Sequence, residues 1–175
     1  MLRVAILTVS DRAASGVSLD ASGPAIARLL QEQLGTAVQE QQVTPDEQPL
    51  IEAALRGWAD RGDVDVILTT GGTGFARRDV TPEATQAVID RPAPGLAEAM
   101  RAASLQVTPH AMLSRATAGI RGRTLIVNLP GSPKAACETL AVILPVLPHA
   151  AELLQQGAQP VIYHHARPGE HGTAG

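Results

Sequence analysis

Two aspartates in this 175-residue sequence stand where a loop leads into a helix: Asp46 in "VTPDEQ" and Asp79 in "TTGGTGFARRDVTPEAT". The glycine-rich stretch before Asp79 can expose several backbone N–H groups without obstruction by Cβ atoms, and such concave backbone binds anions. A carboxylate beside a phosphate site repels the ligand unless a cation mediates, and Mg²⁺ held by carboxylate and phosphate oxygens is the usual mediator. The sequence therefore suggests that Asp46 and Asp79 could together hold Mg²⁺ against a nucleoside triphosphate.

Two other loops carry groups that suit a phosphate ligand. "TVSDR" places Ser10 and Asp11 after an apolar run, where they could touch a ligand or simply make a turn. "NLPGSPK" follows another apolar run, with Ser132 as an expected helix cap and Lys134 as a point charge. Positive charge for phosphates would come from Lys134 and from the two arginines that precede Asp79, Arg77 and Arg78.

Each of these features also has a purely structural interpretation. A glycine-rich loop is often only a tight strand-to-helix turn, and Asp46 could be an acidic helix start. Asp79 could cap a helix or pair with Arg78, and Lys134 could be a solvated side chain. Neither GxxxxGK[ST] nor GxGxxG is present, so a P-loop and a Rossmann dinucleotide site are not indicated. Cys137 is expected to be a small buried residue, because no histidine is arranged beside it for nucleophilic work.

Short apolar strands that alternate with amphipathic helices must position these loops. We expect strands over residues 3–9, 36–43 and 63–70, helices from Pro24, over 46–60, from Thr81, over 94–105 and after Ser132, and a hairpin within 112–129. Ser22 and Thr81 are expected N-caps, and Leu50 is expected in a buried stripe. This order predicts an α/β fold of three layers, with a mostly parallel sheet and helices on both faces. Ligands of such folds bind beyond the carboxyl ends of the strands, so the polar loops should meet at one edge.

Composition narrows the class of protein. A net charge of −3 and only three aromatic residues argue against nucleic-acid binding and against an anionic membrane surface as partner. The first apolar run is too short to cross a bilayer and lacks a signal-peptide cleavage site. A single cysteine, Cys137, cannot form an internal disulfide, which favours a cytoplasmic location. We expect one domain over residues 1–163 and a disordered tail over 164–175, where no apolar pattern occurs.

Several motifs occur together in an order that resembles the molybdopterin adenylyltransferase family. This is the MogA/MoaB group of molybdenum-cofactor biosynthesis, also found as the G domain of gephyrin. The resemblance covers about residues 3 to 155, and its most specific part is the pair "GGTGxxxRDVTPEAT" and "LPGSPKA". One departure is Phe75, where the family pattern commonly has a small residue or proline. The other motifs are "TVSDRAASG", "DASGP", "VTPDE" and "MLSRATAG".

The resemblance implies an activity and assigns residues to it. The family uses ATP and Mg²⁺ to adenylylate the terminal phosphate of molybdopterin, releasing pyrophosphate, and it is usually trimeric. Asp46 and Asp79 match the aspartates needed for the chemistry. The nucleotide and phosphates would lie against Thr70, Gly71, Gly72, Thr73 and Gly74, with Ser10 and Asp11 nearby. Molybdopterin would contact Ser114, Asn128 and Pro130, with Gly131, Ser132 and Lys134 following in the same loop.

Three other functions are compatible with the same motifs. A molybdotransferase, which inserts the metal, contains a domain of this fold but typically carries a different glycine loop and extra domains; such an enzyme is also a candidate downstream partner. A non-catalytic or weakly active pterin-binding member would lack turnover although it keeps the fold. A general anion-binding module would bind phosphates without consuming ATP. The presence of both Asp46 and Asp79 favours the adenylyltransferase.

Overall fold

The computed structural model describes residues 2–156. The expected tail over 164–175 and the expected domain end at residue 163 lie outside the described residues.

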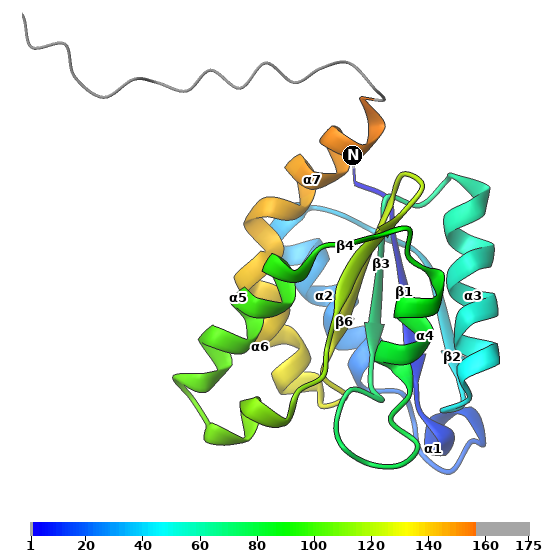
Figure 1. Cartoon of the computed structure of the whole chain (residues 1–175), viewed down its shortest axis with the longest axis vertical. Helices are drawn as coiled ribbons and strands as arrows, with labels where there is room; N and C mark the ends of the chain where they lie inside the picture. Colours follow the sequence, from blue (N-terminus) through cyan, green and yellow to red (C-terminus); the bar gives the residue numbers. More distant parts are fainter. Residues whose placement is uncertain (1, 157–175) are drawn as a thin grey trace, which may run out of the picture.

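A six-stranded sheet forms the middle of the molecule, in the order β2-β1-β3-β6-β5-β4 (Figure 1). The strands β1 (Val4–Val9), β2 (Val38–Thr44), β3 (Val66–Thr70) and β6 (Thr124–Leu129) are parallel to one another. β5 (Ala118–Arg121) and β4 (Arg91–Pro92) add an antiparallel edge. The predicted mostly parallel sheet and the predicted hairpin, formed by β5 and β6, are therefore confirmed. The two-residue β4 was not expected.

Helices cover both faces of this sheet, which confirms the three-layer prediction (Figure 1). One face carries α2 (Ser22–Leu34), α5 (Pro94–Leu105), α6 (Pro133–Ile143) and α7 (Leu147–Gln155). The other carries α3 (Gln48–Arg61) and α4 (Thr81–Val88). Side chains alternate along β3, so that Leu68 packs in the first core cluster and Ile67 in the second. Three short helices complete the chain: α1 (Asp11–Ala14) and the 3-10 helices η1 (Pro109–Leu113) and η2 (Leu144–Val146).

Both predicted hydroxyl caps on α2 and α4 are wrong. Ser22 is the first residue of α2, and its hydroxyl donates to the Gly131 carbonyl at 2.7 Å. Thr81 is the first residue of α4, and its hydroxyl donates to the Gly71 carbonyl at 2.8 Å. In each case the hydroxyl serves a tertiary contact in the loop region beyond the strands. Leu50 is also not in the buried stripe of α3, because it is 46% exposed.

The stretch Pro133–Gln155 has the length and the mean hydropathy, 1.4, of a helix that could cross a membrane. Core helices of globular proteins meet the same criterion. Here the stretch is interrupted by η2, which contains Pro145, between α6 and α7. Leu140, Ile143 and Leu147 in this stretch are buried against the sheet, which accounts for much of its apolar character.

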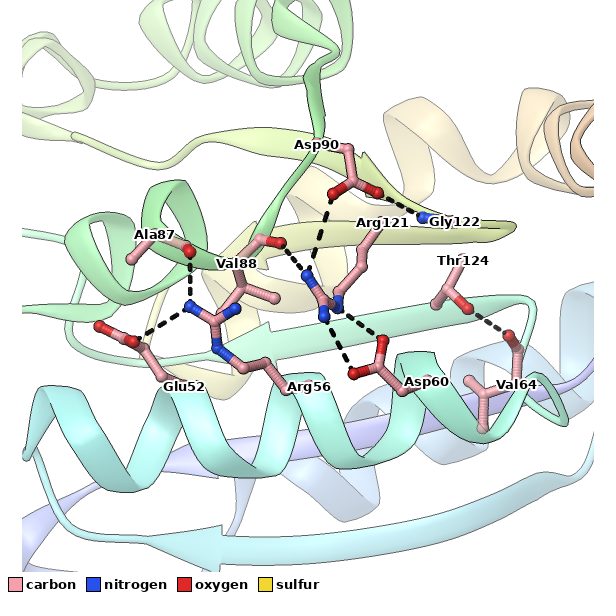
Figure 2. A network of polar contacts seen from close by, with 10 residues as sticks. All are labelled: Glu52, Arg56, Asp60, Val64, Ala87, Val88, Asp90, Arg121, Gly122 and Thr124. Atoms are coloured by element: carbon pink, nitrogen blue, oxygen red, sulfur yellow. Dashed lines mark hydrogen bonds and ion pairs between the residues drawn. The ribbon is translucent and has the colours of Figure 1, made fainter.

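A polar network ties α3, α4 and the hairpin together at the amino end of β6 (Figure 2). Arg121 on β5 donates to both carboxylate oxygens of Asp60 at 2.7 and 2.9 Å and to the Val88 carbonyl at 3.0 Å. Arg56 on α3 donates to the Ala87 carbonyl at 2.6 Å. The network lies at the edge of the sheet opposite the carboxyl ends of the parallel strands, so it supports the fold and not the predicted site.

Candidate active site

The loops that follow the parallel strands meet at one edge of the sheet, as predicted. The backbone N–H of Gly71, after β3, donates to the Leu129 carbonyl at the end of β6, at 3.2 Å. The hydroxyl of Thr70 donates to the Pro130 carbonyl at 2.7 Å. The N–H of Asp11, after β1, donates to the carboxylate of Asp46, after β2, at 2.8 Å.

The two glycines after β3 are required by the closeness of their neighbours. Gly71 has φ +101°, and a Cβ there would lie 2.2 Å from the Val9 carbonyl oxygen. Gly72 has φ +62°, and a Cβ there would lie 2.4 Å from the Thr81 hydroxyl and 3.1 Å from an Asp46 carboxylate oxygen. The loop is therefore held between β1, α4 and Asp46, and the absence of side chains lets Asp46 approach the backbone.

Four successive N–H groups of this loop are available to a ligand. Within residues 2–156, the backbone N–H groups of Gly72, Thr73, Gly74 and Phe75 donate to no protein acceptor. An array of unpaired N–H groups near a helix start is favourable for a phosphate. The interpretation of the glycine-rich stretch as no more than a tight turn does not account for four free donors in succession.

Asp46 and Asp79 each keep one carboxylate oxygen free of protein donors among the described residues. In Asp46, Oδ2 accepts from the Asp11 N–H at 2.8 Å, and the Asp46 N–H donates back to Asp11 Oδ1 at 3.0 Å. In Asp79, Oδ2 accepts from the Ala76 N–H at 2.8 Å. The suggested Asp79–Arg78 pair is wrong, because Arg78 pairs with Asp11, with its Nη2 2.8 Å from Asp11 Oδ1.

Burial and neighbouring charges shift the pKa values of two carboxylates at this edge of the sheet, Asp46 and Asp11. Burial raises the pKa of Asp46 above its usual value, and the charges of Asp11 and Asp79 raise it further, against a backbone hydrogen bond from Asp11 and the positive charge of Arg78. The pKa of Asp11 is lowered, chiefly by the hydrogen bond from Arg78. Asp79 is thus close enough to Asp46 for the two carboxylates to repel each other.

This donor set fits Mg²⁺ shared with a ligand. Among residues 2–156 there is no group of three or more His, Cys, Asp or Glu side chains that could hold a metal ion by itself. Mg²⁺ is commonly bound by one or two carboxylates with phosphate oxygens and water completing its shell, and the free oxygens of Asp46 and Asp79 match that requirement.

A cavity of about 520 Å³ adjoins the loop on the side of α5, η1 and α6. It is lined mainly by apolar groups, including Met100, Leu113 and Val142, and its volume is in the range of small-molecule sites. Five of the predicted site residues line it: Thr73, Gly74, Ser114, Asn128 and Pro130. The other residues expected on the nucleotide side lie outside it: Ser10, Asp11, Asp46, Thr70, Gly71, Gly72 and Asp79. The loop residues Thr73 and Gly74 are where the cavity and the free N–H groups meet.

Asn128 lines this cavity with its polar atoms already engaged. The residue is 0% exposed, and its amide nitrogen donates to the hydroxyls of Thr69 at 2.9 Å and Thr85 at 2.8 Å. Its side-chain oxygen accepts from the Thr117 N–H at 3.2 Å. Its position matches the predicted site, but its contacts are those of a residue that holds the cavity wall together.

The loop after β6 is only partly in the site as expected. Ser132 caps α6 by accepting from the Ala135 N–H at 3.1 Å, as predicted. Lys134 is 83% exposed and lies 3.8 Å from Glu138, which matches the solvated interpretation. Neither Gly131, Ser132 nor Lys134 lines the cavity.

Two further residues lie at the site, and neither was predicted from the sequence. Arg115 donates through Nε to the Gly74 carbonyl at 2.7 Å, through Nη2 to the Asp79 carbonyl and through Nη1 to Glu83. Asp20 accepts from the Thr8 hydroxyl at 2.8 Å and from the first N–H groups of α2 at 3.0 Å. Both occur in quoted motifs, "MLSRATAG" and "DASGP", but nothing in the local sequence indicates their distant partners.

Comparison with known proteins agrees with these motifs. Residues 5–149 match the family described as "Probable molybdopterin binding domain". The molybdopterin adenylyltransferase of Helicobacter pylori strain J99 is 44% identical over 154 residues, which cover 87% of this chain and 88% of that protein. The Escherichia coli K12 molybdopterin adenylyltransferase is 49% identical over 140 residues, covering 79% and 72% respectively. Gephyrin of Dictyostelium discoideum is 46% identical over 160 residues, but the match spans only 22% of its length.

Solved structures give the same result. The molybdopterin biosynthesis enzyme MoaB of Thermus thermophilus superposes with a TM-score of 0.84 at 54% identity, covering 89% of this chain and 98% of that one. The tungsten cofactor synthesizing protein MoaB of Pyrococcus furiosus does so with a TM-score of 0.79 at 32% identity, covering 89% and 98%. The chain therefore belongs to the MogA/MoaB family of molybdopterin-binding proteins.

Proposed function

We propose that this protein is a molybdopterin adenylyltransferase, which transfers AMP from ATP to the terminal phosphate of molybdopterin. The observation that carries the proposal is the junction of two unlike surfaces at Thr73 and Gly74: a row of free N–H groups beside Asp46 and Asp79, and a largely apolar cavity. A polyphosphate suits the first surface and a pterin ring the second. Relatives at 44–49% identity that bear this name support the proposal.

The reaction needs no protein nucleophile. A terminal phosphate oxygen of molybdopterin forms a bond to the α-phosphorus of ATP, the bond from that phosphorus to the bridging oxygen breaks, and the electron pair leaves with pyrophosphate. The protein's part is to hold two anions in line, with loop N–H groups on the nucleotide and the cavity wall on the pterin. Asp46 and Asp79 would hold Mg²⁺, which when bound neutralises phosphate charge. Ser10 and Asp11 would border the nucleotide side.

We further propose that the chain is a cytoplasmic homotrimer that delivers its product to a molybdotransferase. Two exposed apolar side chains outside the cavity lining support self-association: Leu105 on α5 and Met112 on η1. Light scattering at micromolar concentration should give three times the chain mass, and a monomer mass would contradict the proposal.

The decisive assay incubates the protein with molybdopterin and MgATP and measures adenylyl-molybdopterin and pyrophosphate. Asp79→Asn keeps the size of the side chain and an acceptor for the Ala76 N–H, but loses the charge. We expect kcat to fall on the order of 10²–10³-fold, with molybdopterin affinity retained, and the same for Asp46→Asn. Asp63→Asn, an exposed aspartate just before β3, is the matched control and should turn over normally.

The outcomes separate the alternatives. Full turnover by Asp79→Asn would contradict the metal-binding role. Molybdopterin binding by the wild-type protein without release of pyrophosphate would instead identify a non-catalytic pterin-binding member.

A further inference from the structure

We propose that Arg115 is a positioning residue for the phosphate-binding loop, residues 71–75. It holds carbonyl oxygens of this loop, so that the N–H groups on the other side of the same peptide bonds face the nucleotide. The inference rests on the proposed function for what the loop binds, but the orientation of the loop follows from contacts within the chain.

Four consecutive carbonyl groups of the loop are anchored by two residues. Thr81 takes the first two, through its hydroxyl to the Gly71 carbonyl at 2.8 Å and through its N–H to the Gly72 carbonyl at 3.1 Å. Arg115 takes the next two, through its N–H to the Thr73 carbonyl at 2.9 Å and through Nε to the Gly74 carbonyl at 2.7 Å.

The geometry of the peptide bond turns these anchors into an orientation of the donors. A planar trans peptide places the C=O of one residue opposite the N–H of the next, and no cis peptide occurs among the described residues. The carbonyls held by Arg115 therefore point the N–H groups of Gly74 and Phe75 away from it. Those held by Thr81 do the same for Gly72 and Thr73. These are the four N–H groups that have no protein acceptor within residues 2–156.

The Arg115 side chain is engaged by three protein acceptors. Each of its three guanidinium nitrogens makes a protein contact: Nε with Gly74, Nη2 with the Asp79 carbonyl and Nη1 with Glu83. Glu83 is in the first turn of α4, so the guanidinium links that helix to Gly74 in the loop and to the Asp79 backbone that follows it. Through the Asp79 carbonyl it also fixes the backbone that carries one proposed metal-binding carboxylate.

An arginine is required because three acceptors in different directions must be met at once. Its planar fork presents five N–H donors in fixed directions, whereas a lysine ammonium is a single point on a flexible stem. If Arg115 acted only by its positive charge, lysine would replace it. If it acts by holding carbonyls, lysine will not.

The chain offers a matched control in Arg121. It too pairs with a carboxylate, Asp60, and donates to a helix-terminal carbonyl, that of Val88, but at the opposite edge of the sheet (Figure 2). Loss of Arg121 should affect folding alone. A comparison of the two arginines separates an effect on the loop from a general loss of stability.

The test measures steady-state kinetics of Arg115→Gln, Arg115→Lys and Arg121→Gln with both substrates, beside their thermal midpoints. The backbone N–H of residue 115 still donates to the Thr73 carbonyl in both Arg115 variants, so these variants test the guanidinium contacts with Gly74 and Asp79. For both we expect KM for MgATP to rise about tenfold or more and kcat to fall on the order of 10²-fold. KM for molybdopterin should change less than about threefold, because Ser114 and the apolar cavity wall remain. Arg121→Gln should lower the thermal midpoint and leave both KM values unchanged. Because KM does not depend on the fraction of folded protein, a purely structural role for Arg115 would not move it.

Two results would overturn the inference in an active enzyme: an unchanged KM for MgATP in Arg115→Gln, or full recovery in Arg115→Lys. Calorimetric titration with MgATP alone keeps the inference distinct from the proposed function. A wild-type protein that binds MgATP without turnover would refute only the proposed function, and weaker MgATP binding by both Arg115 variants would still support the inference. A wild-type protein that binds no MgATP would overturn both.

Discussion

Replacing Asn128 with alanine should lower the free energy of unfolding by about 3 kcal/mol. The substitution removes two donated hydrogen bonds, to Thr69 and Thr85, and one accepted from the Thr117 N–H. Both threonines that accept are 0% exposed, and among the described residues their hydroxyls have no other side-chain partner. A buried polar group left unsatisfied costs about 1–3 kcal/mol, and we use the lower end for each of three groups because the vacated space can admit a water.

The measurement is urea unfolding at constant m-value, together with KM for molybdopterin. Asn128→Ala should be less costly by about 1 kcal/mol in a Thr85→Val background, because one of its partners is already absent. Ser114→Ala is the matched control in the same cavity. Within residues 2–156 its hydroxyl is engaged by the Ala116 N–H alone, at 3.4 Å, so stability should be kept while KM for molybdopterin rises.

The reasoning would be refuted by an Asn128→Ala variant within about 0.5 kcal/mol of the wild type that nonetheless shows a raised KM for molybdopterin. That result would mean that the Asn128 amide turns toward the pterin, as the family resemblance implied, and that its contacts with the two threonines contribute little.

Two further predictions concern the ends of the sheet. Burial acts to raise the pKa of Asp65, but hydrogen bonds from the side chain and backbone of Arg3 outweigh it and hold the pKa below its usual value. Asp65→Asn should therefore lower stability at pH 7. A lowered folded-state pKa stabilises the protein fully above the unfolded-state pKa of about 3.9, and this stabilisation is lost as pH falls from there toward the folded-state pKa, so the difference between variant and wild type should shrink. Equal differences in urea midpoint at pH 7 and pH 3 would contradict this. Gly71→Ala places a Cβ 2.2 Å from the Val9 carbonyl oxygen at a positive φ and should cost more than about 2 kcal/mol, whereas Gly57→Ala, with open space in α3, should be neutral or stabilising by about 0.5–1 kcal/mol in the same unfolding assay.

The order of strands and helices could be predicted because it follows from local patterns of apolar residues in the sequence. β1 and β3 are apolar for most of their length, and both are buried on both faces, so a continuous apolar run was the right signal. β4 has no such pattern: it is two exposed residues, Arg91 and Pro92, that pair with β5 only because the chain passes that edge. Leu50 fits the helical spacing but lies at the exposed start of α3, where the sheet does not reach it.

The site was predictable to the extent that its residues follow strands. The carboxyl ends of parallel strands share an edge, so Asp11 and Asp46 could be placed together without knowing their contacts. The hydroxyl partners of Ser22 and Thr81 could not be predicted, because a serine or threonine near a proline indicates a cap equally well whether it bonds its own helix, as Ser132 does, or a distant carbonyl. Arg115 was missed for the same reason: its acceptors lie 32 to 42 residues earlier, and only the fold brings them within reach.

The charges at this edge explain why a nucleotide should arrive with a divalent cation. The charge of Asp79 adds to the cost of ionising Asp46, and Arg78, which attracts Asp46, is already paired with Asp11. A bare triphosphate would therefore meet net repulsion on one side of the loop, although the free N–H groups attract it on the other. A shared cation removes the repulsion and leaves the attraction, which would make affinity for ATP strongly dependent on Mg²⁺ while affinity for the pterin, held in the apolar cavity, depends on it little. The same arrangement links the conformation of the loop to the cation. The N–H groups oriented by Thr81 and Arg115 can bind a phosphate only if the charges of the nearby carboxylates are neutralised.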